Sequence, residues 1–254
     1  MKKLVIACFS PTGNSKKYAK ILAEKINMPY DIIDFTIKEN RQKEIIVIEE
    51  NMILFSAPVY AGRLPNIDLF ENVKTNGALA VCIVTYGNRE YDDALLELKN
   101  VCEQKGFHVV AAGAFIGEHT YSQYIGANRP NEKDILKIEE LAQYIKNGIQ
   151  TNQWNDKKIE VKGNYPYCPN QAIPFVPQPN EKCSRCGICA KKCPVGAIDD
   201  STFLADSQKC ISCFACVKCC TKSARVVENG QYPQLVEKLE KNLRYVEKEA
   251  EIFF

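Results

Sequence analysis

Two copies of one cysteine pattern stand near the end of this sequence. The stretch KCSRCGICAKKC, residues 182–193, recurs as KCISCFACVKCC, residues 209–220, at an offset of 27 residues. Each copy has the spacing C-x2-C-x2-C-x3-C. Cysteines concentrated in this way form disulfides or bind metal. The choice between the two decides how this part of the chain folds.

The rest of the sequence favours metal. The run LVIA at residues 4–7 is too short for a secretory signal, and no run of about 18 apolar residues occurs, so we expect a cytoplasmic protein without a membrane span. In that reducing compartment disulfides are disfavoured. Zinc usually takes two separated pairs of ligands, which three cysteines at two-residue intervals supply poorly. They suit a [4Fe–4S] cluster, because a short loop can bind three corners and a remote thiolate the fourth.

The repeat resembles bacterial two-cluster ferredoxins, in which the fourth cysteine of each copy binds the cluster of the other copy. That arrangement assigns one [4Fe–4S] cluster to Cys183, Cys186, Cys189 and Cys220, and a second to Cys210, Cys213, Cys216 and Cys193. Pro194 follows Cys193 as in that family, whereas Thr221 follows Cys220. Cys219 misses the repeat and is interpreted as a spare thiol.

The first 150 residues alternate apolar runs with amphipathic segments. This predicts an α/β domain with a five-stranded parallel sheet that helices cover on both faces. The expected strands are Leu4–Phe9, Tyr30–Phe35, Met52–Ala57, Leu79–Thr85 and Phe107–Phe115. The expected helices are Ser15–Ile26, Asp92–Lys105 and Asp134–Ile145. The stretch RQKEIIVIEE, residues 41–50, could be a helix or an extra strand.

Five prolines in residues 164–179 indicate an extended linker. The expected plan is a cofactor-binding domain at 1–150, a linker at 151–180, a small α+β cysteine domain at 181–228 and an amphipathic helix at 229–254. That helix would carry Leu235, Leu239, Leu243 and Val246 on one face, packed on another domain.

The loop SPTGNSKK follows the first expected strand and opens the first expected helix. Backbone N–H groups at a helix N-terminus bind phosphate. The alternative is an ordinary helix cap by Asn14 or Ser15. The loop is neither a Walker A sequence nor G-x-G-x-x-G, and it resembles the FMN phosphate loop of flavodoxins. The resemblance makes cofactor-binding residues of Ser10, Pro11, Thr12, Gly13, Asn14 and Ser15.

The resemblance to flavodoxins implies a doubly wound sheet with the strand order 2-1-3-4-5. In that order two further loops end at the same sheet edge, SAPVYAGRLP at residues 56–65 and TYGNREYDD at residues 85–93. Each offers glycine for close approach and tyrosine for stacking on a flavin ring. Tyr60 and Tyr91 are the first stacking candidates and Tyr86 the next. The Ala61–Gly62 peptide could turn toward the flavin N5. The full set of candidates is Pro58, Val59, Tyr60, Ala61, Gly62, Thr85, Tyr86, Gly87, Asn88 and Tyr91.

The whole chain resembles fusions of a flavodoxin with a two-cluster ferredoxin found in anaerobic microbes. The resemblance implies FMN, two [4Fe–4S] clusters and electron transfer. We therefore expect a cytoplasmic electron-transfer flavoprotein whose partners are redox proteins. The alternatives are an FMN- and iron–sulfur-dependent reductase of a small acceptor, and an oxygen or iron sensor without redox cycling. A net charge of +2 gives no reason to expect nucleic acid binding.

Four cysteines and two histidines lie outside these motifs. Cys8, Cys82 and Cys102 are expected to behave as small buried apolar residues, and Cys168 has no visible partner in the sequence. His119 follows the fifth expected strand and could donate a proton near the flavin, although a structural role is favoured. His108 is expected to be structural.

Overall fold

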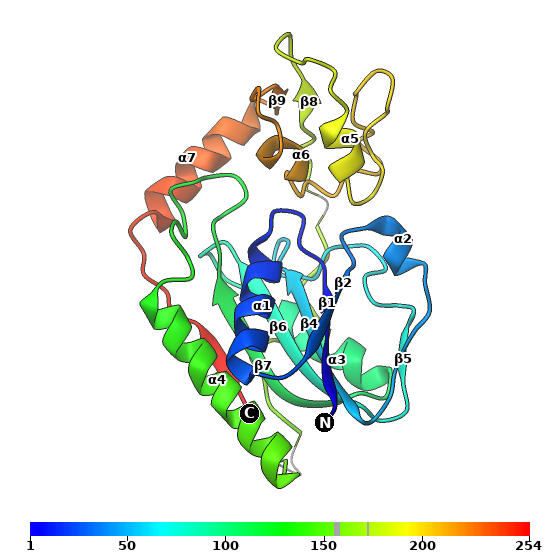
Figure 1. Ribbon diagram of the computed structural model, residues 1–254. Helices are drawn as coiled ribbons and strands as arrows, with labels where there is room; N and C mark the ends of the chain where they lie inside the picture. The colour runs from blue at the N-terminus through cyan, green and yellow to red at the C-terminus, as the bar shows by residue number, and fades with distance from the viewer. Residues whose placement is uncertain (155–157, 172) are drawn as a thin grey trace.

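The computed structural model describes residues 1–154, 158–171 and 173–254 (Figure 1). Part of the expected linker, residues 155–157 and 172, therefore lies outside the described residues. The helices are α1 (Asn14–Ile26), α2 (Lys38–Arg41), α3 (Ala94–Gln104), α4 (Glu132–Thr151), α5 (Ile188–Lys192), α6 (Ala215–Lys218) and α7 (Gln231–Leu243). The strands are β1 (Lys3–Cys8), β2 (Tyr30–Asp34), β3 (Ile45–Val47), β4 (Asn51–Pro58), β5 (Val73–Thr75), β6 (Leu79–Tyr86), β7 (His108–Ile116), β8 (Gln178–Pro179), β9 (Arg225–Val226) and β10 (Glu251–Phe253).

The main sheet has six strands in the order β10-β7-β6-β4-β1-β2. The five strands from β1 to β7 are parallel, and β10 adds to β7 in the antiparallel direction. The expectation of a five-stranded, purely parallel sheet is therefore wrong in strand number and direction. The missed strand is three residues long and belongs to a segment that was expected to be helical.

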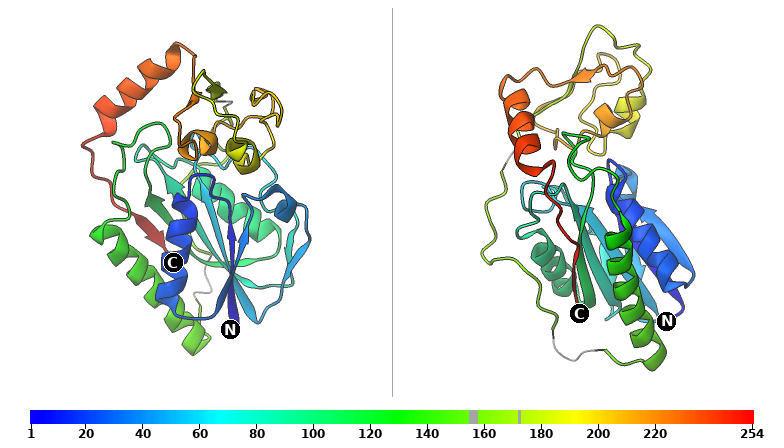
Figure 2. Two further views of the ribbon diagram at one scale, coloured as in Figure 1. Left: turned by 45° about the horizontal axis from the view of Figure 1, so that its top comes forward. Right: turned by 90° about the vertical axis from the view of Figure 1, so that its left-hand side faces the viewer.

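Helices cover both faces of this sheet (Figure 2). On one face α1 and α4 bury residues such as Tyr18, Leu22 and Leu141 against the sheet, and on the other α3 buries Leu95 and Leu98. The central strands β4 and β6 are mostly apolar, as expected for strands with both faces covered. None of the helices in the described part of the chain has the length and apolar character of a membrane span.

The ambiguous segment at residues 41–50 forms a short strand. Arg41 ends the four-residue α2, and β3 then pairs in parallel with β5 in a separate two-stranded sheet. The β-branched run Ile45–Val47 explains the choice, since such side chains suit a strand better than a helix.

Residues 178–228 form what we call the cysteine-rich module, which lies beyond the carboxyl ends of the parallel strands (Figures 1 and 2). It starts earlier than residue 181, because β8 pairs with β9 across the module. The two copies of the cysteine repeat in this module have similar backbone conformations. Left-handed residues recur 27 positions apart, in the pairs Arg185 and Ser212, Gly187 and Phe214, and Gly196 and Ser223. The sequence repeat is therefore also a structural repeat.

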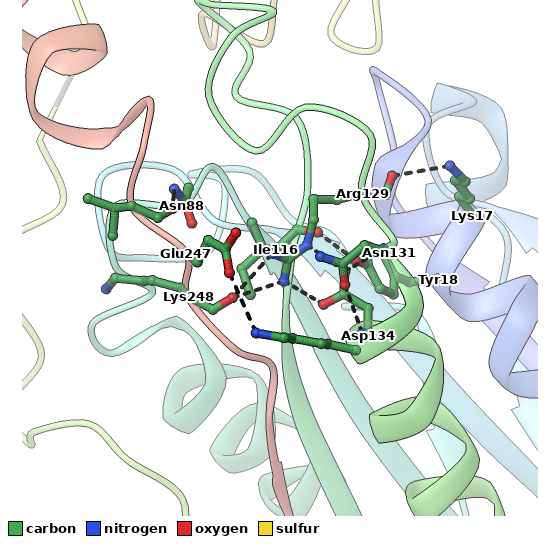
Figure 3. A network of polar contacts seen from close by, with 11 residues as sticks. Lys17, Tyr18, Asn88, Ile116, Arg129, Asn131, Asp134, Glu247 and Lys248 are labelled. Carbon is green, nitrogen blue, oxygen red and sulfur yellow. Dashed lines mark hydrogen bonds and ion pairs between the residues drawn. The ribbon is translucent and has the colours of Figure 1, made fainter.

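The last part of the chain returns from the module to the sheet. The expected helix at 229–254 ends at Leu243, and Val246 lies beyond it. The segment then runs along the sheet domain to β10. Arg129 fixes this segment, since its guanidinium donates to the Lys248 carbonyl oxygen at 3.1 Å and contacts the buried Asp134 carboxylate at 2.5 Å (Figure 3).

Candidate cofactor sites

A cavity of about 360 Å³ opens where β1, β4 and β6 end, under the cysteine-rich module. We call it the large cavity. Three loops expected to bind a cofactor meet there. The expected residues that line it are Ser10, Pro11, Thr12, Asn14, Ser15, Pro58, Val59, Tyr60, Ala61, Thr85, Tyr86 and Gly87. The other expected residues, Gly13, Gly62, Asn88 and Tyr91, are outside its lining.

The loop before α1 leaves a helix N-terminus facing the cavity. Gly13, the N-cap residue, has a φ of 94° and offers no side-chain cap, and the first turn of the helix contains no acidic residue. The Ser10 hydroxyl accepts a hydrogen bond from the Lys16 backbone N–H at 3.0 Å. The alternative of a cap by Asn14 or Ser15 therefore does not apply. Asn14 instead donates its side-chain amide to the Glu118 carbonyl oxygen at 3.0 Å. The hydroxyl of Ser15 shares a 2.6 Å hydrogen bond with that of Thr85. These two side chains brace the loop, and the remaining backbone N–H groups of the first turn are the ones that could donate to an anion.

Tyr91 does not stack on anything in the large cavity. Its ring is fully buried, with its centroid 5.4 Å from that of Tyr86. Its hydroxyl donates to Glu251 in β10 at 2.9 Å. The expectation that Tyr91 faces the cavity is wrong, because the hydroxyl finds its partner in the strand that the sequence did not reveal. Tyr60 and Tyr86 line the cavity.

Gly62 and Asn88 also have structural partners. The Gly62 carbonyl oxygen accepts from the Asp93 backbone N–H at 3.0 Å, and a Cβ at Gly62 would lie 2.4 Å from an Asp92 carboxylate oxygen. A Gly62→Ala substitution would thus disturb packing as well as any cofactor. The Asn88 side chain donates to carbonyl oxygens at the end of α7, away from the cavity.

Several lining residues were missed by the sequence interpretation, because tertiary packing brings them in from distant segments. They are Arg89, Gly117, Glu118, Thr120, Tyr121, Gln171, Ile173, Phe175, Ser212, Leu235 and Leu239. Tyr121 is the centre of an aromatic group, with ring centroids 4.7 Å from Phe214 and 5.9 Å from Phe175. The apolar face of α7 was visible in the sequence, and it covers this cavity.

His119 lines the large cavity with a neutral ring. Burial, aided by the positive charges of Arg89 and Lys218, lowers its pKa to about 4. Its Nδ1 accepts from the backbone N–H of Tyr121 at 3.1 Å, so that nitrogen carries no proton. The other nitrogen therefore carries the proton and is a donor. His108 is exposed at the start of β7.

The cysteine-rich module encloses two smaller cavities. The one that we call the outer cysteine cavity is lined by Cys183, Cys186, Cys189 and Cys220, together with Cys219. The other, the inner cysteine cavity, is lined by Cys193, Cys210, Cys213 and Cys216. Each cavity thus takes three cysteines from one copy of the repeat and the fourth from the other copy. The donor sets fit the thiolate ligation of [4Fe–4S] clusters.

The fourth cysteines of the two copies have matching environments. The Ala197 N–H donates to the Cys193 sulfur at 3.2 Å, and the Ala224 N–H donates to the Cys220 sulfur at 3.3 Å. Such hydrogen bonds stabilise thiolates. Cys219 differs, since its thiol donates to the Cys216 carbonyl oxygen at 3.5 Å. Within the described residues no group of three or more His, Cys, Asp or Glu converges on a single-ion site.

The inner cysteine cavity adjoins the large cavity. Ser212, between Cys210 and Cys213, lines the large cavity. Burial raises the pKa of Tyr60 well above its usual range, and Cys213 is near enough to contribute. Burial also raises the pKa of the Cys213 thiol to about 12, so a metal must displace its proton on binding. The outer cavity is more open, and Cys186 is exposed.

Comparison with known proteins gives a match for the first part of the module. Residues 179–199 match the model of the 4Fe–4S binding domain family. The chain joins a flavodoxin-like domain to a 4Fe–4S binding domain. Over 67 residues it is 36% identical to a selenate reductase subunit from Mesobacillus selenatarsenatis, a match that covers 25% of this chain and 23% of that protein. The chain thus spans about a quarter of the curated relative that it matches.

Solved structures similar to the flavodoxin-like domain include three flavodoxins. The Streptococcus pneumoniae TIGR4 protein is 17% identical, with coverage of 56% of this chain and 95% of that one and a TM-score of 0.39. A flavodoxin from the domain Archaea is 15% identical, with coverages of 58% and 99% and a TM-score of 0.41. Fusobacterium nucleatum flavodoxin bound to flavin mononucleotide is 14% identical, with coverages of 58% and 98% and a TM-score of 0.39.

The scattered cysteines lie in the flavodoxin-like domain and beside it. Cys8, Cys82 and Cys102 are buried, as expected, and the Cys82 thiol lies 3.6 Å from the Cys102 sulfur. The Cys168 thiol, for which the sequence showed no partner, donates to the Gly62 carbonyl oxygen at 3.9 Å. The Cys168 backbone N–H donates to the Asp93 carboxylate at 2.5 Å, which fastens the linker to the start of α3.

Proposed function

We propose that this protein transfers electrons between an acidic redox protein and FMN in the large cavity, through [4Fe–4S] clusters in the two cysteine cavities. The combination of a flavodoxin-like and a 4Fe–4S binding domain supports electron transfer or oxidoreduction. The observation that carries the finer proposal is Ser212, which lines the large cavity while its neighbours Cys210 and Cys213 line the inner cysteine cavity. The inner cluster would therefore be the one next to the flavin.

The residues around the large cavity fit FMN. The N-terminus of α1, with the hydroxyl of Thr12, would hold the phosphate. Tyr60 and Tyr86 would flank the ring system, and His119 has a donor nitrogen and no positive charge. Bound FMN supplies chemistry that exchanges one or two electrons, whereas each cluster exchanges one.

The large cavity is covered on its outer side, which favours internal transfer. Leu235 and Leu239 of α7 and the linker residues Ile173 and Phe175 line it together with the flavodoxin-like loops. Apolar side chains at these positions exclude water and keep a protein partner away from the flavin. This cover favours electron transfer between proteins over a reductase that admits a small acceptor freely.

The outer cysteine cavity offers an entry point. Cys186 is exposed beside Ile188, an apolar side chain that is 42% exposed. Two basic residues, Arg185 and Lys222, line this cavity, and three more lie close to its cysteines in the sequence, Lys182, Lys191 and Lys192. All five are exposed and have no ion pair among the residues that the structure describes. A basic rim around an apolar centre attracts an acidic protein and orients it.

A rapid-mixing experiment tests this proposal. Anaerobically reconstituted protein is mixed with a small acidic ferredoxin in reduced form, and flavin absorption is followed. We expect reduction whose rate falls steeply with salt, and a rate at least tenfold lower in the double variant Lys191→Glu and Lys192→Glu. Lys20→Glu, an exposed position on α1, is the control with the same sign of charge change.

Two outcomes would overturn the proposal. If the reconstituted protein shows no flavin or cluster absorption, the cofactor assignment is wrong. If the rate of flavin reduction depends on salt equally in the wild type and in the double variant, the basic rim is not the entry point. Reduction of the flavin by NADH or NADPH in a variant that lacks the inner cluster would instead support the small-molecule reductase.

A further inference from the structure

Arg225 occupies the wall between the two cysteine cavities. Its side chain lines both of them, yet the residue is only 4% exposed. It begins β9, whose short pairing with β8 holds the backbone in place. A guanidinium in this position is a buried positive charge at the centre of the module.

Two of its three nitrogens are anchored to backbone. One terminal nitrogen donates to the Phe203 carbonyl oxygen and the other to the Pro177 carbonyl oxygen, both at 2.6 Å. These bonds hold the guanidinium plane in one orientation. The third nitrogen, Nε, is buried and has no hydrogen-bond acceptor among the described residues. No carboxylate in that part of the chain pairs with Arg225 either.

The internal repeat carries an apolar residue at the position equivalent to Arg225. The equivalent position, 27 residues earlier, is Ile198, which is buried in an apolar cluster with Ala205 and Cys216. An aliphatic side chain therefore suits this place in the repeat. Burying an unpaired guanidinium costs several kcal/mol more than burying an apolar side chain. An anion that the protein acquires later would offset this cost.

A cluster bound by the cysteines around Arg225 would supply that anion. Arg225 lines both cavities, but Cys213 and Cys216 of the inner cavity are buried whereas Cys186 of the outer cavity is exposed, so water screens the charge of Arg225 less at the inner cavity. A [4Fe–4S] cluster held by four thiolates carries a net negative charge, and one-electron reduction adds one more. A fixed positive charge nearby stabilises the reduced cluster more than the oxidised one.

We propose that Arg225 is a positioning residue that raises the reduction potential of both clusters, and of the inner cluster more than the outer. This inference rests on the proposed function, because it requires a cluster in each cavity. Electron transfer from the outer cluster to the inner cluster is then more favourable than it would be without Arg225. Arg225 would thus direct electrons inward, toward the large cavity.

The test is a redox titration of the intact, reconstituted protein monitored by electron paramagnetic resonance. We expect Arg225→Met to lower the reduced-to-oxidised ratio of the inner cluster at least tenfold at a fixed solution potential, which is about 59 mV for one electron. The ratio of the outer cluster should fall less. Arg225→Lys keeps the charge and should stay closer to the wild type than Arg225→Met.

Controls separate the possible failures. Arg185→Met removes a charge from the exposed rim of the outer cavity and should move the inner potential little. Unchanged potentials in fully loaded Arg225→Met would overturn the role of Arg225 alone, and so would an Arg225→Lys potential as low as that of Arg225→Met. Wild-type protein with iron for a single cluster would overturn the proposed two-cluster function. If Arg225→Met fails to load, Arg225→Ile, which copies the other half of the repeat, takes its place.

Discussion

The side-chain amide of Asn88 donates to the carbonyl oxygen of Val246 at 2.8 Å. The same amide donates to the last carbonyl of α7, so one side chain from the loop after β6 fastens the end of a distant helix. A residue expected to bind a cofactor therefore holds the cover of the large cavity in place.

Asn88→Asp should loosen this cover. The substitution keeps the size of a side chain that is only 2% exposed and replaces its donor by a carboxylate facing two carbonyl oxygens. We expect a loss of about 2 kcal/mol in the free energy of unfolding and faster amide hydrogen exchange in α7. Asn152→Asp is the control, since Asn152 also has positive φ but is exposed. Equal exchange rates in both variants would contradict the prediction.

Variants at Cys219 and Cys220 should differ in the amount of iron that the protein binds. Cys220 has the same N–H···S hydrogen bond as its repeat partner Cys193, whereas the Cys219 thiol is bonded to a backbone carbonyl. Cys220→Ser should lose about half of the bound iron and sulfide, as expected when one of two clusters is lost. Cys219→Ser should keep all of it. Chemical iron analysis after anaerobic reconstitution decides, and the reverse pattern would reassign the fourth ligand.

Substitutions of Tyr60 and Tyr91 should have different effects, the first on FMN binding and the second on stability. Tyr60→Leu removes a ring from the large cavity and should weaken FMN binding at least tenfold, measured by quenching of flavin fluorescence. Tyr91→Phe removes only the hydrogen bond to Glu251 and should cost about 1 kcal/mol of stability. Its FMN affinity should match that of the wild type. A large loss of affinity in Tyr91→Phe would show that the ring reaches the flavin.

His119 should resist protonation down to a pH near 4. Because its folded pKa is lowered from 6.5 to about 4, the unfolded chain binds more protons between these values. The folded state is therefore destabilised as the pH falls through this range, by up to about 3 kcal/mol. Imidazole NMR signals give the titration directly, because the chain has two histidines and His119→Gln assigns them. A midpoint near 6.5 would contradict the buried, neutral ring.

The sequence predicted the centre of the fold better than its edge. Long apolar runs such as β4 and β6 are buried on both faces, so their pattern alone reveals them. β10 has three residues and draws its stability from pairing with β7 and from ring stacking of Phe254 on Tyr144, at 4.2 Å between centroids. Contacts of this kind depend on the tertiary structure and leave no local periodicity.

The two kinds of site differ in the same way. The cysteine cavities follow from short-range spacing, and the structure brings each expected set of four together. The large cavity is assembled from segments far apart in the chain, so the sequence located its loops but not its aromatic wall at Tyr121 and Phe175. In the loop TYGNREYDD, Tyr86 lines the cavity and Tyr91 does not, because the Tyr91 hydroxyl is bonded to Glu251, a residue about 160 positions away.

The return of the chain to β10 changes what kind of fusion this is. The 4Fe–4S domain is inserted between two elements of one sheet domain, α4 and β10, instead of hanging from its end. It is therefore tethered through two separate stretches of chain, the linker and α7. A single proteolytic nick in the linker would leave the module attached. Two tethers also restrict swinging of the module, so the spacing between its electron carriers and the large cavity is set by the architecture and not by chance encounters.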